Sequence, residues 1–197
     1  MAPIPKGSKV AVTGSAGFIG SWVVNRLLAK GYRVNACVRD AGDVEKTQFL
    51  RDMPGYATGR LKLFSADLDQ EGCFDDAFAG CQGVAHLSHV SDYDDPDYMV
   101  RVCQHTIDSV NRAQTVNRVV VTSSIAAVIS EADIKEVRRR PVFYEERYPD
   151  EENPKRTPER GQGYSMGKVA LERMFSDAAA ANGDWDCIVV CPADNGG

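Results

Sequence analysis

A tyrosine and a lysine near the end of the chain have a spacing that could support acid–base chemistry. Tyr164 and Lys168 lie one helical turn apart, so the ammonium group can favour the phenolate form of the tyrosine. Two residues at this spacing are more often plain neighbours on a helix face. The pair gains meaning because Gly14, Gly17 and Gly20 recur at every third position near the start of the chain. Together the two segments indicate carbonyl chemistry that depends on a nicotinamide.

The glycine-rich segment stands in the context that dinucleotide binding requires. It follows an apolar run at residues 9–13, predicted to be a buried strand, and it precedes a stretch of helical periodicity. Glycine permits a tight turn and a close approach of bare backbone to a pyrophosphate, and the next helix begins with unpaired N–H groups. The predicted cofactor contacts of this segment are Gly14, Ala16, Gly17, Phe18, Ile19 and Gly20.

The end of the second predicted strand indicates which dinucleotide fits. NAD-selective sites place a carboxylate there, whereas a 2′-phosphate needs an arginine. Val38 occupies the expected acid position and Arg39 follows it, which favours NADP(H) over NAD. Asp40 lies at the nominal distance for a ribose-binding acid, but we expect it to turn outward or to cap the following helix. Lys46 could add a second positive charge; the alternative is that Arg39 and Lys46 are a solvated surface pair.

Two further strand ends supply candidate cofactor contacts. Asp67 and Leu68 follow the third strand, where a short carboxylate can accept a hydrogen bond from adenine; Asp67 as a helix N-cap is an equally good interpretation. Leu87 and Ser88, at the end of the fourth strand, are predicted to present backbone to the cofactor. We expect His86 to be a packed core or rim histidine rather than a catalyst.

The fifth strand ends in hydroxyl side chains, at Thr122, Ser123 and Ser124. Carbonyl reduction needs a hydride from the nicotinamide and a proton for the developing alkoxide. Tyr164 is the predicted acid, and Lys168 would tune it and hold the nicotinamide ribose. A serine hydroxyl would stabilise the reacting oxygen, and Ser123 and Ser124 compete for that role. No Gly-x-Ser-x-Gly segment suggests a serine nucleophile.

The elements that must position these residues alternate regularly. Apolar runs at residues 9–13, 33–38, 61–65, 83–87, 118–122 and 186–191 are separated by helical periodicity. This alternation predicts an α/β protein with a doubly wound parallel sheet, the Rossmann fold, in strand order 3-2-1-4-5-6 and with both faces covered. Residues 1–197 form one predicted domain. Residues 131–163 are rich in charge and proline and are predicted to be a surface loop, either a solvated linker or a flap on the substrate side.

Composition excludes several classes of protein. The chain has 197 residues, of which 43% are hydrophobic and 26% charged, as in an ordinary globular domain. Its net charge of −5 opposes binding to nucleic acid. No segment approaches the ~18 consecutive apolar residues of a membrane span, and the first residues lack the apolar core of a signal peptide, so we expect a cytoplasmic protein. The six cysteines show no Cys-x-x-Cys pair and are expected to be reduced, and we expect no metal site. A homodimer is compatible with the sequence.

In combination, these motifs resemble the extended short-chain dehydrogenase/reductases. The segments that carry the resemblance are the glycine turn through Trp22, Val38-Arg39-Asp40, Ala66-Asp67-Leu68, Val121-Thr122-Ser123-Ser124 and Tyr164-x-x-x-Lys168. The nearest branch contains the dihydroflavonol, cinnamoyl-CoA and carbonyl reductases. The resemblance implies NADPH, a small-molecule carbonyl substrate and a catalytic set of Ser124, Tyr164 and Lys168, with Ser124 chosen over Ser123. Pro192, after the sixth strand, is also included among the predicted cofactor contacts.

The chain departs from this family in three places. Residues 105–108 read His-Thr-Ile-Asp where the family has Gly-Thr-Leu-Asn, so we expect altered helix packing there. Residues 161–163 read Gly-Gln-Gly where the plant enzymes tend to carry a tryptophan, which argues against a cinnamoyl-CoA or flavonoid specialist. The chain stops soon after the sixth strand, where family members continue, so we expect it to contain little of the substrate-binding region. An NADPH-dependent reductase of aldehydes or ketones is the leading hypothesis; an NAD-dependent sugar-nucleotide epimerase or dehydratase, which Arg39 disfavours, and a non-catalytic NADP-binding protein are the alternatives.

Overall fold

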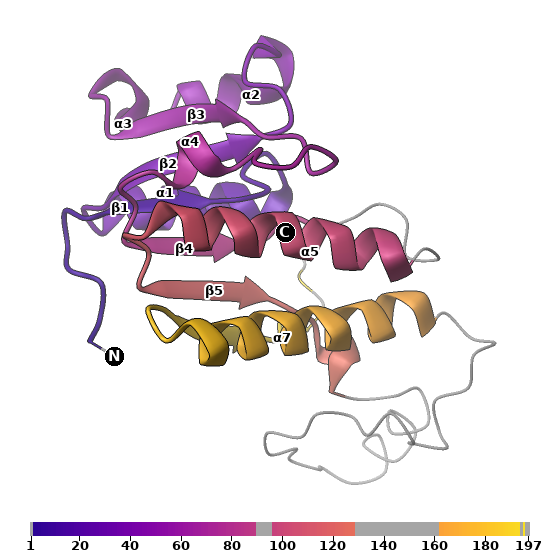
Figure 1. The fold of residues 1–197 in the computed structure, drawn as a ribbon. Coiled ribbons are helices and arrows are strands. Elements are labelled where there is room, and N and C mark those ends of the chain that lie inside the picture. The colour runs from indigo at the N-terminus through magenta and orange to yellow at the C-terminus, as the bar shows by residue number, and fades with distance from the viewer. Residues whose placement is uncertain (1, 90–95, 129–161, 194, 196–197) are drawn as a thin grey trace, which may run out of the picture.

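A six-stranded parallel sheet forms the centre of the molecule, in the order β3-β2-β1-β4-β5-β6 (Figure 1). The computed structural model describes residues 2–89, 96–128, 162–193 and 195. The strands are β1 (Lys9–Val12), β2 (Arg33–Val38), β3 (Leu61–Ser65), β4 (Gly83–His86), β5 (Arg118–Thr122) and β6 (Asp186–Val190). The predicted strands, strand order and Rossmann fold are therefore confirmed, with strand ends shifted by at most one residue.

One face of the sheet is covered by α4 (Asp75–Phe78), α5 (Pro96–Ala113) and α7 (Gln162–Asn182). In Figure 1 α5 and α7 lie side by side in front of the strands. Side chains of a strand alternate between the two faces, so Val119 and Val121 of β5 point to this side. They are buried with Val84 of β4 and with Phe175 of α7. This packing holds α7, which carries Tyr164 and Lys168, against the half of the sheet formed by β4, β5 and β6.

The opposite face is covered by α1 (Phe18–Ala29), α2 (Val44–Arg51) and α3 (Pro54–Ala57) over β1, β2 and β3 only. In the described part of the chain no helix lies on this face of β5 and β6. Ile188 and Val190 of β6 are exposed there, and Trp22 of α1 is 58% exposed. A hollow of about 520 Å³ lies between α1 and Val120 of β5. The prediction that both faces are covered is correct for half of the sheet, because the strand pattern specifies an apolar face but not what packs on it.

The turn between β2 and α2 has a local explanation. Asp43 is the N-cap of α2, and its Oδ1 accepts a hydrogen bond from the backbone N–H of Lys46 at 3.1 Å. Asp40 is exposed, and its Oδ1 accepts instead from the backbone N–H of Gly42 at 2.7 Å. Asp40 thus turns outward, as predicted, while the helix cap is Asp43.

The predicted charged loop at 131–163 lies almost entirely outside the described residues. Its last two positions are an exception, because α7 begins at residue 162. The loop boundary predicted at 163 is therefore wrong by two residues. The glycines that flank Gln162 disfavour a helix, but Leu171 and Phe175 farther along α7 pack in the core, and tertiary packing decides where a helix begins.

Candidate cofactor and active site

The turn between β1 and α1 brings bare backbone to the carboxyl end of the sheet. Gly14 has a φ of +63°, which L residues rarely adopt, and a Cβ there would lie 3.0 Å from the backbone nitrogen of Ser88. A Cβ on Gly20 would lie 2.1 Å from the carbonyl oxygen of Gly14, so α1 crosses directly against the turn. The helix begins at Phe18, and its first turn contains no acidic side chain. The N-terminus of α1 therefore offers N–H groups and a partial positive charge to an anion.

A buried hydrogen-bond network joins the ends of β1 and β4. The Oγ1 of Thr13 accepts hydrogen bonds from the backbone N–H groups of Leu87 and Ser88, at 2.9 and 3.0 Å. Since both lone pairs are used, the hydroxyl proton points to the Nδ1 of His86, 3.1 Å away. Burial, and then the nearby positive charge of Lys168, lower the pKa of His86 to about 3. His86 is thus a neutral core residue, as predicted, and Leu87 and Ser88 face the cleft with their N–H groups already bonded.

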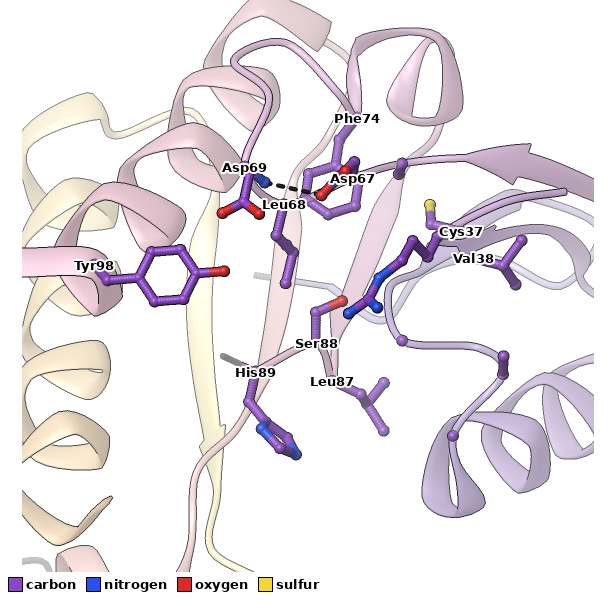
Figure 2. A pocket seen from close by; sticks show the side chains of 15 residues that line it. Cys37, Val38, Asp67, Leu68, Asp69, Phe74, Leu87, Ser88, His89 and Tyr98 are labelled. Atoms are coloured by element: carbon purple, nitrogen blue, oxygen red, sulfur yellow. Dashed lines mark hydrogen bonds between the residues drawn. The ribbon is translucent and has the colours of Figure 1, made fainter. Parts of the chain in front are cut away.

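A first hollow of about 400 Å³ opens between the glycine turn and the ends of β2 and β3, and we call it the β2–β3 hollow (Figure 2). The residues around it that had been predicted as cofactor contacts are Gly14, Ala16, Gly17, Arg39, Asp67, Leu68, Leu87 and Ser88. Figure 2 shows Val38 and Leu87 on one side of this hollow and the Tyr98 hydroxyl pointing into it below Asp69. Its lining is apolar at the strand ends and charged at the rim, which suits an adenine ring and its ribose.

The two cations predicted to recognise a 2′-phosphate occupy different places. Arg39 is exposed and lines the β2–β3 hollow at the end of β2. The ammonium of Lys46 instead forms an ion pair with Asp43 at 2.9 Å, its side chain is 81% exposed, and it does not line the hollow. Of these two cations, only Arg39 therefore lies at the β2–β3 hollow.

The loop after β3 is held by its own side chains and by α5. The Oδ1 of Asp67 accepts from the backbone N–H of Asp69 at 3.2 Å, and a ring nitrogen of His105 lies 3.1 Å from the carbonyl oxygen of Leu68. Asp67 does not cap α4, because the N-cap of that helix is Phe74. A hydrogen bond with Asp69 is the main reason why the pKa of Tyr98 is raised. These hydrogen bonds hold Asp67 and Leu68 in place as one wall of the β2–β3 hollow.

A second hollow of about 570 Å³ adjoins the first, and we call it the β5 hollow. It is lined by the predicted reacting residues and by the remaining predicted contacts, which are Ser124, Tyr164, Lys168, Phe18, Ile19, Gly20 and Pro192. Gly14, Gly17, Leu87 and His89 line both hollows. The two hollows therefore form one cleft along the carboxyl ends of the strands, the usual place for a ligand in a doubly wound sheet.

The lysine at the β5 hollow is held inside the protein. Lys168 is only 4% exposed, and its Nζ donates to the carbonyl oxygen of Thr122 at 3.1 Å. The same Nζ lies 5.7 Å from the centre of the Tyr164 ring. Burial lowers the pKa of Lys168, while Cys103, Glu172 and Cys191 act in the opposite direction. The tyrosine and its cation are thus neighbours at one wall of the cleft.

The two neighbouring serines have different surroundings. Ser123 is buried, and its Oγ donates to the carboxylate of Glu172 behind the sheet end. Ser124 is half-buried and lines the β5 hollow, where its Oγ accepts from the backbone N–H of Ala126 at 3.2 Å. Both serines line the β5 hollow, but the hydroxyl proton of Ser123 is already donated to Glu172, whereas that of Ser124 is left for a ligand.

Three residues of this region were missed by the sequence analysis. Glu172 follows Lys168 by four residues, a helical spacing that could have drawn attention to it. His89 and Tyr98 line the cleft from the end of β4 and from α5, and no local pattern indicates that.

Within residues 2–89, 96–128, 162–193 and 195, no cluster of His, Cys, Asp and Glu could hold a metal ion. The helices in those ranges include none with the length and apolar character needed to cross a membrane.

Comparison with known proteins gives consistent matches. Residues 10–197 match the family described as "NAD dependent epimerase/dehydratase family". Dihydroflavonol 4-reductases from Hordeum vulgare and Zea mays are 38% and 39% identical over 190 residues, covering 93% of this chain and 52% and 51% of theirs. The crystal structure of vestitone reductase from Medicago sativa superposes with a TM-score of 0.67 at 26% identity, covering 93% of this chain and 56% of that one. The chain spans about half the length of the curated relatives it matches.

Proposed function

Because this chain belongs to the NAD dependent epimerase/dehydratase family, as its motifs predict, we propose that it is an NADPH-dependent reductase that converts an aldehyde or ketone to an alcohol. One observation carries the proposal: Ser124, Tyr164 and Lys168 line the same cleft as the glycine turn. An acid, a cation and a hydroxyl donor thus share a wall with a dinucleotide-type turn, as reduction of a carbonyl requires.

The fit of the cofactor to this cleft supports the proposal. Gly14 and Gly17 leave room for a pyrophosphate beside the N-terminus of α1, and Asp67 and Leu68 form a wall for adenine. Arg39 at the end of β2 would bind a 2′-phosphate, because a guanidinium matches phosphate geometry. Lys46 would contribute less, since it already pairs with Asp43. Bound NADPH would supply the hydride.

The residues of the β5 hollow would supply the proton and stabilise charge. The hydroxyl of Ser124 accepts from a backbone N–H, which leaves its own proton to donate to the substrate oxygen. Tyr164 would transfer its phenolic proton to the developing alkoxide, so that the alcohol leaves neutral. The ammonium of Lys168 would stabilise the resulting phenolate until solvent returns the proton. Pro192 lines the same hollow, and its carbonyl oxygen accepts from the N–H of Ile125, so it would hold the nicotinamide end in place.

The relatives suggest a substrate class to test first. The names of the plant relatives indicate reduction of a flavonoid ketone, so a dihydroflavonol belongs in the panel beside simple aldehydes and ketones. The chain covers only half of those relatives, and its own substrate is therefore part of the proposal. We further propose a cytoplasmic protein, in keeping with the composition.

The decisive experiment measures NADPH consumption at 340 nm against that panel, for the wild type and for Tyr164→Phe. We expect Tyr164→Phe to lose on the order of 100-fold or more in kcat and to keep its affinity for NADPH, because only the proton donor is removed. Tyr32→Phe is the matched control, since the Tyr32 hydroxyl bonds to Ile4 away from the cleft. Turnover that survives Tyr164→Phe would refute the mechanism.

A fluorescence titration separates the remaining alternatives. NADPH binding much tighter than NADH is expected from Arg39. NAD bound more tightly than NADP would favour an epimerase or dehydratase of the same family. Tight NADPH binding with no carbonyl reduced, by a chain shown to be folded, would favour a non-catalytic binding protein.

A further inference from the structure

The helix that carries Tyr164 also grips the segment that carries Ser124. Three polar side chains on successive turns of α7 bond to the end of β5 and to the 3-10 turn η1 (Ile125–Ala127) that follows it. The bonds join Ser165 Oγ to the Ala126 carbonyl at 2.8 Å, Lys168 Nζ to the Thr122 carbonyl at 3.1 Å, and Ser123 Oγ to Glu172 Oε1. The relative positions of Ser124 and Tyr164 therefore depend on three side chains of α7, of which Lys168 lines the cleft and Ser165 and Glu172 do not.

Glu172 is a buried carboxylic acid of this set that does not line the cleft. It is only 6% exposed, and a buried carboxylate is costly unless it is paired and hydrogen-bonded. Its Oε1 accepts from Ser123 and, at 3.5 Å, from the thiol of Cys191. Lys168 lies four residues earlier on the same side of α7, where residues at this spacing interact.

We propose that Glu172 is a positioning residue: it fixes the turn that carries Ser124 against α7, and its charge balances the buried ammonium of Lys168. The proposal rests on the proposed reductase function, because it assigns Glu172 to the same reaction. Glu172 does not line the cleft, so it acts through Ser123 and Lys168 and not on substrate.

The other groups around Lys168 leave Glu172 as the charge that matters near neutral pH. Burial lowers the pKa of Lys168, and Cys103, Glu172 and Cys191 raise it. Burial raises the pKa of Cys103 to about 12 and also raises that of Cys191, so both thiols are uncharged at neutral pH. His86, on β4, has a pKa of about 3 and is neutral as well. Of these neighbours, only Glu172 then offers a negative charge.

A charged Lys168 matters because the mechanism uses it to stabilise the Tyr164 phenolate. Burial lowers the pKa of Lys168 and the Glu172 carboxylate raises it, so removal of the carboxylate should lower that pKa. Tyr164 is a further titratable group beside the ammonium, because the Nζ of Lys168 lies 5.7 Å from the centre of its ring. Loss of the Glu172 charge should therefore narrow the pH range of the reaction from the alkaline side.

The charge is tested without turnover by carbon-13 NMR of the lysine side chains in the labelled full chain, with the Lys168 signal assigned by Lys168→Arg. Glu172→Gln keeps the size and an acceptor oxygen for Ser123 but removes the charge, and Ser123→Ala keeps the charge but removes the bond. We expect the titration midpoint of Lys168 to fall in Glu172→Gln and to stay unchanged in Ser123→Ala. Equal midpoints in the wild type and Glu172→Gln would overturn the proposal. If Glu172→Gln does not fold, Glu172→Asp replaces it as the test, because aspartate keeps the negative charge. Glu172→Asp is then expected to fold and to keep the wild-type Lys168 midpoint. A lowered Lys168 midpoint in Glu172→Asp would reject the proposal.

The positioning is tested by kinetics on the same variants. A displacement of about 1 Å at a reacting group can cost on the order of 100-fold, and a variant that keeps the hydrogen bond should lose less, about tenfold in kcat. We expect Glu172→Gln to lose that much, with KM for NADPH unchanged and the alkaline limb of kcat moved to lower pH, whereas Ser123→Ala lowers kcat without moving the limb. An unmoved limb contradicts the role of Glu172. If the Lys168 midpoint is lower in Glu172→Gln than in the wild type, but the wild type reduces no carbonyl, only the reductase function is rejected.

Discussion

Replacement of Gly20 by alanine tests whether the glycine turn and α1 are packed as closely as the structure shows. A Cβ at this position would lie 2.1 Å from the carbonyl oxygen of Gly14, about 1.3 Å inside the 3.4 Å at which ordinary contact begins. Alanine gains about 1 kcal/mol over glycine in a helix, whereas overpacking costs about 1–3 kcal/mol. The atoms that it meets belong to the backbone of the turn and cannot rotate away, so the cost should fall at the upper end of that range. We therefore expect a net loss of about 2 kcal/mol.

For a chain of this size, that loss corresponds to a fall in Tm of about 4–8 °C. Urea unfolding and a thermal scan measure it, and NADPH titration should show weaker binding because the turn must move away from α1. Asn25→Ala is the matched control: Asn25 is an exposed position of the same helix, so the helix propensity rises there with no clash, and Tm should stay or rise. A Gly20→Ala protein as stable as Asn25→Ala would refute the packing of the turn.

Three further predictions concern charge. Burial lowers the pKa of His86 to about 3, so the free energy of unfolding of the wild type should fall by up to about 1.4 kcal/mol per pH unit as pH falls from about 6.5 towards 3. His86→Gln should lose less over the same range. Urea unfolding at pH 7 and pH 5 measures both losses, and equal losses would contradict the prediction. Asp186→Asn should lower Tm by about 2–4 °C at pH 7, since Asp186 accepts from Arg118 at 2.7 Å across β5 and β6. That hydrogen bond lowers the pKa of Asp186, so the difference should vanish as pH falls below about 4, and a difference that persists there would count against the ion pair. Arg39→Ala should reduce the preference for NADPH over NADH by about 10–100-fold, and Lys46→Ala should change it much less; equal effects in a binding titration would reject the assignment of the phosphate to Arg39.

The fold could be predicted because its signals are local and repeated. Each strand is an apolar run bounded by polar or glycine residues, and the glycine turn follows the first strand directly. Parallel strands place their carboxyl ends at one edge, so the residues after β1, β2, β3 and β5 had to meet there. For this reason Gly14, Arg39, Asp67 and Ser124, which are far apart in the sequence, all line the cleft; their roles there stay predictions.

What could not be predicted depends on side-chain direction and on contacts between distant segments. Ser123 and Ser124 are neighbouring residues of the same type, and the sequence does not indicate that the first bonds to Glu172, 49 residues away. Lys46 has the right charge for a phosphate, but the cap residue of its own helix lies closer to it. Tyr98 lines the cleft from α5, and no sequence pattern around it predicts that it lies close to the glycine turn.

A crystal structure of the chain with NADPH tests the central claim most directly, because it locates both ends of the cofactor at once. The account predicts the 2′-phosphate beside Arg39, the pyrophosphate over Gly14 and Gly17, and the nicotinamide in the β5 hollow beside Tyr164 and Lys168. A nicotinamide placed outside that hollow, or a Tyr164 hydroxyl turned away from the ring, would contradict it.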